Sequence, residues 1–279
     1  MPSMNIEIPE QPSRRQLLTL LGGAGGLGLL ALAGCGSGTD SASADNGARS
    51  TSLATTATTG ATTSTTAANT ATVTSAVPEE TGGPYPGDGS NGPDYLGMNG
   101  AVRSDIRTSL GSSAAVAGVP LTIELTVLDL KNSAKPLTNA GIYLWHCNQV
   151  GQYSMYGQGV TNETFCRGIQ PTDSSGTATF TSVWPGAYSG RWPHIHFQVY
   201  PSVNGATSAS GKLKTSQIAL PEAACDVVYA TVGYGASIRN MAQTSLASDM
   251  VFRDGWSQEL ATANGSTSNG YTATLVIGV

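Results

Sequence analysis

The chain has 279 residues and a net charge of −5, and charged residues make up only 11% of it. No basic stripe is present, so nucleic acid is excluded as a partner. The length suits one large or two small domains. The composition is uneven, however, so the folded part is smaller than the length suggests.

The first 35 residues have the pattern of an export signal. Arg14 and Arg15 precede a Leu-, Gly- and Ala-rich run that ends at Cys35. A charged region, an apolar stretch and small residues in this order are typical of a signal peptide. The paired arginines resemble a twin-arginine signal, and Leu32-Ala33-Gly34-Cys35 resembles a lipobox. We therefore expect residues 1–35 to be a twin-arginine-type lipoprotein signal, with an uncleaved signal anchor as the alternative.

This signal predicts an exported cell-envelope lipoprotein on the periplasmic or cell-surface side of the membrane, anchored by a lipid on Cys35. Residues 36–78 consist almost entirely of Ser, Thr, Ala and Gly. They lack the apolar surface needed to offset the entropy of ordering, which predicts a disordered linker. Residues 79–279, about 200 in number, suit a single domain.

Several stretches of this domain alternate with a period of two, which is typical of half-buried strands. The clearest are residues 121–127, 177–183 and 271–277. Polar and glycine-containing turns separate them, and helical periodicity is confined to residues 221–229 and 236–246. The predicted fold is all-β, a two-sheet and mostly antiparallel β-sandwich with one or two short helices.

If Cys35 is lipidated, three cysteines remain in the domain, namely Cys147, Cys166 and Cys225. In an oxidising compartment this odd number permits one disulfide and one free thiol. We expect Cys147 and Cys166 to form the disulfide, because both flank the region that carries the candidate site.

Two of the three histidines form a His-x-His pair within residues 191–199. In a strand, His194 and His196 project from one face while Ile195 and Phe197 project from the other. The two imidazoles are then roughly 7 Å apart at the backbone, a span over which they can converge on one metal. The alternative is a pair of polar side chains that face solvent.

Other ligands for a metal are scarce near this pair. Carboxylates are missing, and His146 fits a structural or supporting role better than a ligand role. Tyr153 and Tyr188 are available, both in glycine-rich turns, although each tyrosine alone also fits a packing role. Phenolates are hard anionic ligands, so they favour ferric iron over a divalent or soft metal.

An ordered series of motifs carries a family resemblance: Trp145-His146-Cys147-Asn148, Gly151-Gln152-Tyr153-Ser154, Phe165-Cys166-Arg167-Gly168, Pro185-Gly186-Ala187-Tyr188 and Arg191-Trp192-Pro193-His194-Ile195-His196-Phe197. Residues 79–279 resemble the intradiol ring-cleavage dioxygenases, and in particular their exported single-chain members, related to the protocatechuate and catechol enzymes. The resemblance implies the same sandwich fold.

The resemblance also implies which residues act. Four ligands of Fe(III) fall on Tyr153, Tyr188, His194 and His196. Arg191 would stabilise negative charge on the substrate ring, and Gln217 would orient the adduct by a hydrogen bond. Tyr188 would leave the metal and accept a substrate proton. The implied reaction cleaves a catechol-type aromatic diol with O2 to a muconate-type dicarboxylate, in a protein that forms a homodimer.

Two departures from the family pattern concern the substrate entrance rather than the ligands. The segment between Tyr153 and Arg167 is short, and Gly82 stands where glutamate is more usual. Two other functions remain open from the sequence. One is a non-catalytic binding sandwich on a surface tether, and the other is a copper or zinc protein that uses His194, His196 and His146.

Overall fold

The computed structural model describes residues 73–279, so the predicted signal and most of the predicted linker lie outside the described residues. Within residues 73–279, no helix is long and apolar enough to cross a membrane. Val77 is buried, and its N–H donates to the Gly278 carbonyl at 3.0 Å, so docking against the last strand already begins there.

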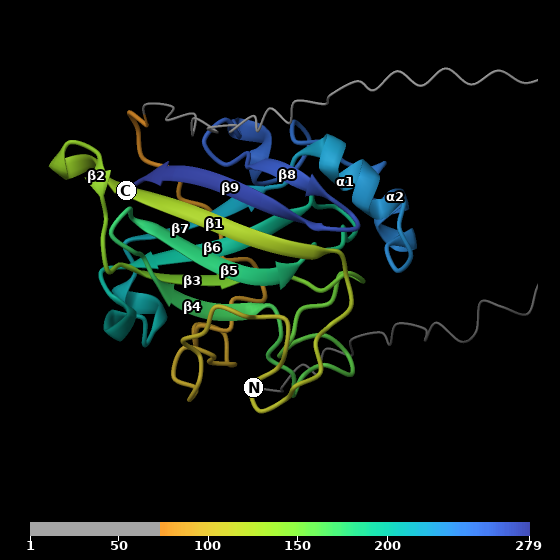
Figure 1. Ribbon diagram of the computed structural model, residues 1–279, viewed down its shortest axis with the longest axis horizontal. Helices are drawn as coiled ribbons and strands as arrows, with labels where there is room; N and C mark the ends of the chain where they lie inside the picture. The colour runs from red at the N-terminus through yellow and green to blue at the C-terminus, as the bar shows by residue number, and fades with distance from the viewer. Residues whose placement is uncertain (1–72) are drawn as a thin grey trace, which may run out of the picture. The chain divides into compact units, whose positions relative to one another are not determined.

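The first of two sheets contains five strands (Figure 1). The strand order is β2 (Lys135–Pro136), β1 (Pro120–Asp129), β9 (Gly270–Gly278) and β8 (Thr262–Ser266), and β5 (Thr177–Val183) also pairs with β1. The β1–β9 pair is parallel, and the other pairs are antiparallel.

The second sheet has the order β4 (Arg167–Pro171), β3 (Gly141–Trp145), β6 (His194–Tyr200) and β7 (Lys214–Ala219), all antiparallel. The two-sheet, mostly antiparallel sandwich predicted from the sequence is confirmed. The period-two segments at 121–127, 177–183 and 271–277 fall in β1, β5 and β9.

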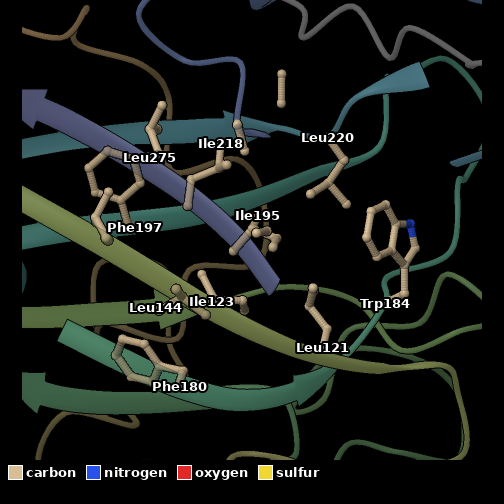
Figure 2. Packing of buried hydrophobic residues seen from close by; sticks show 14 of the residues in the cluster. Leu121, Ile123, Leu144, Phe180, Trp184, Ile195, Phe197, Ile218, Leu220 and Leu275 are labelled. Carbon is tan, nitrogen blue, oxygen red and sulfur yellow. The ribbon is translucent and has the colours of Figure 1, made fainter. Parts of the chain in front are cut away.

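The main core lies between the two sheets. Leu121, Ile123 and Phe180 from the first sheet meet Ile195 and Phe197 from the second, and each is at most 1% exposed (Figure 2). Each such side chain contributes about 1.5–3 kcal/mol when it leaves water. This packing fixes the rotation of β6, and therefore sets the direction in which its histidines point.

Short helices complete the described part. They are α1 (Glu222–Tyr229) and α2 (Gly235–Met241), with the 3₁₀ turns η1 (Leu130–Asn132), η2 (Val203–Gly205), η3 (Ala209–Gly211) and η4 (Phe252–Asp254). The two predicted helices are confirmed, although the second ends at Met241 instead of residue 246. Beyond it, Ser245 and Ser248 bond to each other and to nearby backbone groups, which competes with the helix.

The second sheet is covered on both faces, since all seven residues of β6 are buried. On the face away from the main core, an aromatic series crosses the strands. Tyr95 stacks on Tyr143 at 5.8 Å, Tyr143 stacks on Trp145 at 4.9 Å, and Trp145 stacks on His196 at 4.9 Å between ring centroids. The solvent-facing alternative for the His-x-His pair is therefore wrong.

Candidate metal centre

Four side chains predicted as ligands converge on one point. The Nε2 atoms of His194 and His196 lie 3.1 Å apart, and the phenol oxygen of Tyr188 lies 3.1 Å from His194 Nε2. The phenol oxygen of Tyr153 lies 3.4 Å from both Tyr188 Oη and His194 Nε2. The structure thus brings together two imidazole nitrogens and two phenol oxygens, which we call the four-donor centre. Their role as ligands is still a prediction.

Strand β6 supplies both histidines, and loops supply both tyrosines. Tyr153 follows β3 and Tyr188 follows β5. Gly151 makes the close approach of these loops possible. Its φ is +82°, and a Cβ there would lie 3.3 Å from the Cβ of Tyr188. A larger residue at this position would therefore strain the turn and separate the loops.

A hydrogen bond to the backbone defines the tautomer of His194. Its Nδ1 lies 2.5 Å from the Trp192 carbonyl, so Nδ1 donates and Nε2 carries the lone pair. Burial, and then the charge of Arg191, lower the pKa of His194 to about 3. The ring is neutral at physiological pH, and its lone pair faces the four-donor centre.

Packing holds the ring of His196. The indole of Trp145 is nearly parallel to it, with an interplanar angle of 5°. On the neighbouring strand β7, Gln217 is the cross-strand partner of His196. Gly83, with φ +67°, would place a Cβ 3.3 Å from His196 Cε1. Nδ1 of His196 is buried without a protein partner, and burial lowers the pKa of this ring well below its usual value.

The two phenols differ in their access to solvent. Tyr153 is 3% exposed, whereas Tyr188 is partly buried. Burial raises the pKa of Tyr188 to about 12, and burial together with Tyr188 raises the pKa of Tyr153 well above its usual value. The phenols by themselves stay protonated, so their use as phenolate ligands requires a strongly polarising cation between them.

Arg191 lies beside the four-donor centre with its guanidinium divided among three neighbours. Its Nη1 lies 3.5 Å from His194 Nε2, and its Nη2 donates to Gln217 Oε1 at 2.7 Å. Its Nε donates to Asp249 Oδ2 at 2.9 Å. Gln217 in turn donates to the Thr81 carbonyl at 2.8 Å. The six residues predicted for the site are therefore in one cluster.

The sequence analysis missed Asp249. It is fully buried and lies in the loop before η4, far along the chain from every motif. A single aspartate among serines and threonines offers no spacing that could have identified it.

The donor set fits ferric iron. Two neutral imidazoles and two phenols that a cation can ionise supply nitrogen and hard oxygen donors at one point. Among residues 73–279, no group of three or more His, Cys, Asp or Glu side chains could hold a metal, so a metal here depends on the tyrosines. The cavity found between α1 and α2, about 350 Å³, does not touch the four-donor centre.

His146 has the structural role predicted for it. One ring nitrogen lies 2.7 Å from the Cys147 carbonyl and the other 2.7 Å from Ser182 Oγ. Burial lowers the pKa of His146 to about 4. With both nitrogens engaged elsewhere, His146 does not join His194 and His196, which removes the third imidazole of the copper or zinc alternative.

The predicted Cys147–Cys166 disulfide is wrong. Cys147, Cys166 and Cys225 are all free and buried. The Cys147 thiol donates to the Gly186 carbonyl at 3.2 Å, in the turn that leads to Tyr188. Burial raises the pKa of Cys166 to about 12, so it behaves as a small apolar side chain.

Comparisons with known proteins agree with this arrangement. Residues 90–200 match the family model described as Dioxygenase, a span that holds the four donors and Arg191 but not Gln217 or Asp249. No curated protein matches the chain. Residues 90–200 are thus similar to the Dioxygenase family.

Solved structures show a similar fold. An intradiol ring-cleavage dioxygenase from Tetranychus urticae is similar at 24% identity over 73% of this chain and 94% of that chain, with a TM-score of 0.55. The dioxygenase Tetur07g02040 is similar at 23% identity over 73% of this chain and 93% of that chain, with a TM-score of 0.56. The fold of the chain is therefore similar to that of the intradiol ring-cleavage dioxygenases, the family that its motifs resemble.

Proposed function

We propose that this protein is an oxidoreductase that uses non-haem Fe(III) and O2 to cleave catechol-type aromatic diols between the two hydroxylated carbons. The product would be a muconate-type dicarboxylate that contains both oxygen atoms of O2. The observation that carries the proposal is the four-donor centre, with two phenol oxygens and two imidazole nitrogens 3.1–3.4 Å apart beside a buried arginine. The family-model match over residues 90–200 supports the reaction class.

Tyr153, Tyr188, His194 and His196 would hold the iron, and Fe(III) would act as a Lewis acid toward the two oxygens of the diol. A catechol must lose two protons to bind through both oxygens. Tyr188 is placed to take one of them, because it is the less buried of the two tyrosines. Tyr153 is 3% exposed and held by stacking of Tyr85 at 5.0 Å, which suits a ligand that stays in place.

Arg191 would act on the substrate ring as a fixed positive charge. Its Nη1 faces the four-donor centre, and it lies in a buried environment where a charge acts strongly. Gln217 restrains the guanidinium through Nη2 and is itself fixed by Thr81. Negative charge that develops on the ring would therefore meet a donor already oriented, without a cost of reorganisation.

The test is purification from iron-replete cells, followed by visible spectroscopy, metal analysis and oxygen uptake with a panel of catechols. A phenolate-bound ferric centre is red to burgundy, a zinc protein is colourless, and copper with imidazoles is blue-green. We expect a coloured protein with one iron per chain and consumption of one O2 per diol. A colourless, iron-free preparation without oxygen uptake would refute the proposal and favour a non-catalytic binding sandwich.

The export signal remains a proposal that concerns residues outside the described part. A twin-arginine route carries folded proteins, so iron could be inserted before export. We expect the Arg14→Lys, Arg15→Lys double variant to accumulate inside the cell, and the Cys35→Ser variant to be exported without a lipid. Normal export of the double arginine variant would contradict the twin-arginine route. The homodimer implied by the family resemblance is tested by light scattering of the purified protein.

A further inference from the structure

We infer that Asp249 is the positioning residue that directs Nη1 of Arg191 toward the four-donor centre. This inference rests on the proposed function, since it assigns to Asp249 a role in turnover through Arg191. Asp249 does not touch the four donors in any hydrogen bond of the described residues. Its influence therefore passes through residues that donate to its carboxylate, above all Arg191 and Trp192.

The guanidinium of Arg191 has three nitrogens, and side chains other than the four donors hold two of them. Nε is bound to Asp249 at 2.9 Å, and Nη2 is bound to Gln217 at 2.7 Å. Nη1 has a single contact at the upper limit of hydrogen-bond length, 3.5 Å from His194 Nε2. Two anchored nitrogens fix a planar fork, so the third must point at the centre.

Asp249 is itself anchored, which makes it a suitable fixed point. One carboxylate oxygen accepts from Arg191 Nε and from the Trp192 N–H at 2.6 Å. The other accepts from the N–H groups of Val251 and Phe252, at 2.8 and 3.3 Å. The side chain is fully buried, and four donors leave it no freedom to rotate.

The same carboxylate reaches one of the predicted ligands through the backbone of a single residue, Trp192. Asp249 holds the N–H of Trp192, and the carbonyl of Trp192 accepts from His194 Nδ1 at 2.5 Å. Asp249 therefore helps to set the orientation of both His194 and Arg191. Gln217 in β7 holds the guanidinium of Arg191 at a second point. Loss of Asp249 would therefore leave the guanidinium bound to Gln217 but free to rotate.

The charge of Asp249 matters as well as its position. Arg191 is a buried cation close to two neutral imidazoles, and Asp249 is its ion-pair partner at 2.9 Å. An asparagine at 249 would keep the size of the side chain. It would remove the negative charge and would leave one acceptor oxygen in place of the two carboxylate oxygens that now accept hydrogen bonds. A displacement of about 1 Å in a catalytic group can cost about 10²-fold in rate.

A double-mutant cycle tests the inference. We expect Asp249→Asn to lower kcat for catechol at least about tenfold and to leave KM within about threefold, with the iron content unchanged. Asp254→Asn, the same change at an exposed site five residues away, should retain wild-type kcat. In an Arg191→Ala background, Asp249→Asn should change kcat less than about twofold, because the group through which it acts is gone.

Two results would contradict the positioning role of Asp249. Wild-type kcat in Asp249→Asn, or an undiminished effect in the Arg191→Ala background, would overturn it. Thermal unfolding identifies any variant that does not fold at the assay temperature. Asp249→Glu then replaces Asp249→Asn in the same cycle, since it keeps the charge and moves the carboxylate by one methylene group.

A readout independent of turnover separates this inference from the proposed function. In ¹⁵N NMR of the protein freed of paramagnetic iron by a chelator, the buried Nε–H of Arg191 should exchange slowly with solvent and should be assigned by its loss in Arg191→Lys. Asp249→Asn should abolish its protection, whereas Asp254→Asn should not. An inactive, iron-free wild type with this protected signal would refute the proposed function alone. A signal that survives Asp249→Asn would refute the positioning role of Asp249.

Discussion

The phenol oxygen of Tyr188 lies 3.1 Å from Nε2 of His194. Tyr188 lies in the loop that joins β5 to β6, and His194 is the first residue of β6. Tyr153 reaches the same nitrogen at 3.4 Å from a third part of the chain. The two tyrosines are chemically alike, but they differ in exposure and in neighbours. Different consequences are therefore expected when each loses its hydroxyl.

Tyr188→Phe should retain most of the iron and lower kcat at least about 100-fold, because it removes the proton acceptor on the accessible side. Tyr153→Phe should lose most of the iron, because it removes a buried ligand that nothing nearby can replace. Metal analysis and the charge-transfer band measure both effects. Tyr271→Phe is the matched control, since Tyr271 lies in β9 on the other sheet. Equal iron loss in both variants would contradict the division of roles.

Arg191→Ala should keep the iron and the colour but lose turnover. The guanidinium donates to no carbonyl of the backbone, so its removal leaves the four donors in place. Loss of one fixed donor at a centre of developing charge typically costs about 10²–10³-fold in kcat. Arg239→Ala, an exposed arginine on α2, is the control. Wild-type rates in Arg191→Ala would show that the electrostatic role assigned to it is wrong.

The sequence was sufficient for those parts of the molecule whose residues are close together in the chain. Alternation over 121–127 predicted β1, and the His-x-His spacing predicted that two imidazoles share a face of β6. The ordered motifs then identified the two tyrosines. Each of these inferences depends on local backbone geometry or on a family pattern, and the structure brings the predicted residues together.

Contacts that depend on loop paths could not be predicted. Asp249 meets Arg191 across 58 residues, and no periodicity signals that ion pair. The Cys147–Cys166 disulfide was expected from proximity to the site and an oxidising compartment, but both thiols are free and buried. Full burial of β6 also escaped prediction, because the segments that cover its polar face come from irregular parts of the chain.

Arg167 is expected to hold the loop that carries Tyr153. It is fully buried, and its guanidinium donates to the carbonyls of Tyr85, Pro86 and Ser154 and to the Ser154 hydroxyl. Arg167→Met would leave the carbonyls of Tyr85 and Ser154 without this donor, each at a cost of about 1–3 kcal/mol, while the Tyr143 hydroxyl would still donate to Pro86. We expect a loss of at least about 3 kcal/mol in the free energy of unfolding, together with weaker iron binding. Urea unfolding measures the first and metal titration the second.

The exposed residue Arg253 provides the matched control for this change. Arg253→Met should alter the free energy of unfolding by less than about 0.5 kcal/mol, as is usual for surface substitutions. Equal free energies of unfolding for the Arg167 and Arg253 variants would show that Arg167 does not hold the loop that carries Tyr153.

Glu259 should make stability fall with rising pH. It is fully buried, one of its oxygens has no protein partner, and burial together with Glu80 raises its pKa from 4.5 to about 8. The folded state therefore holds a proton that the unfolded state releases above pH 4.5, and the free energy of unfolding drops by up to about 1.4 kcal/mol per pH unit between these values. Stability from this group is complete below pH 4.5 and is lost as the pH rises toward 8. The side chain of Glu259→Gln cannot ionise. Urea unfolding at pH 5.5 and pH 8.0 should therefore show a smaller decrease in the free energy of unfolding for this variant than for the wild type. Equal decreases in the two proteins would show that Glu259 is already ionised in the folded protein.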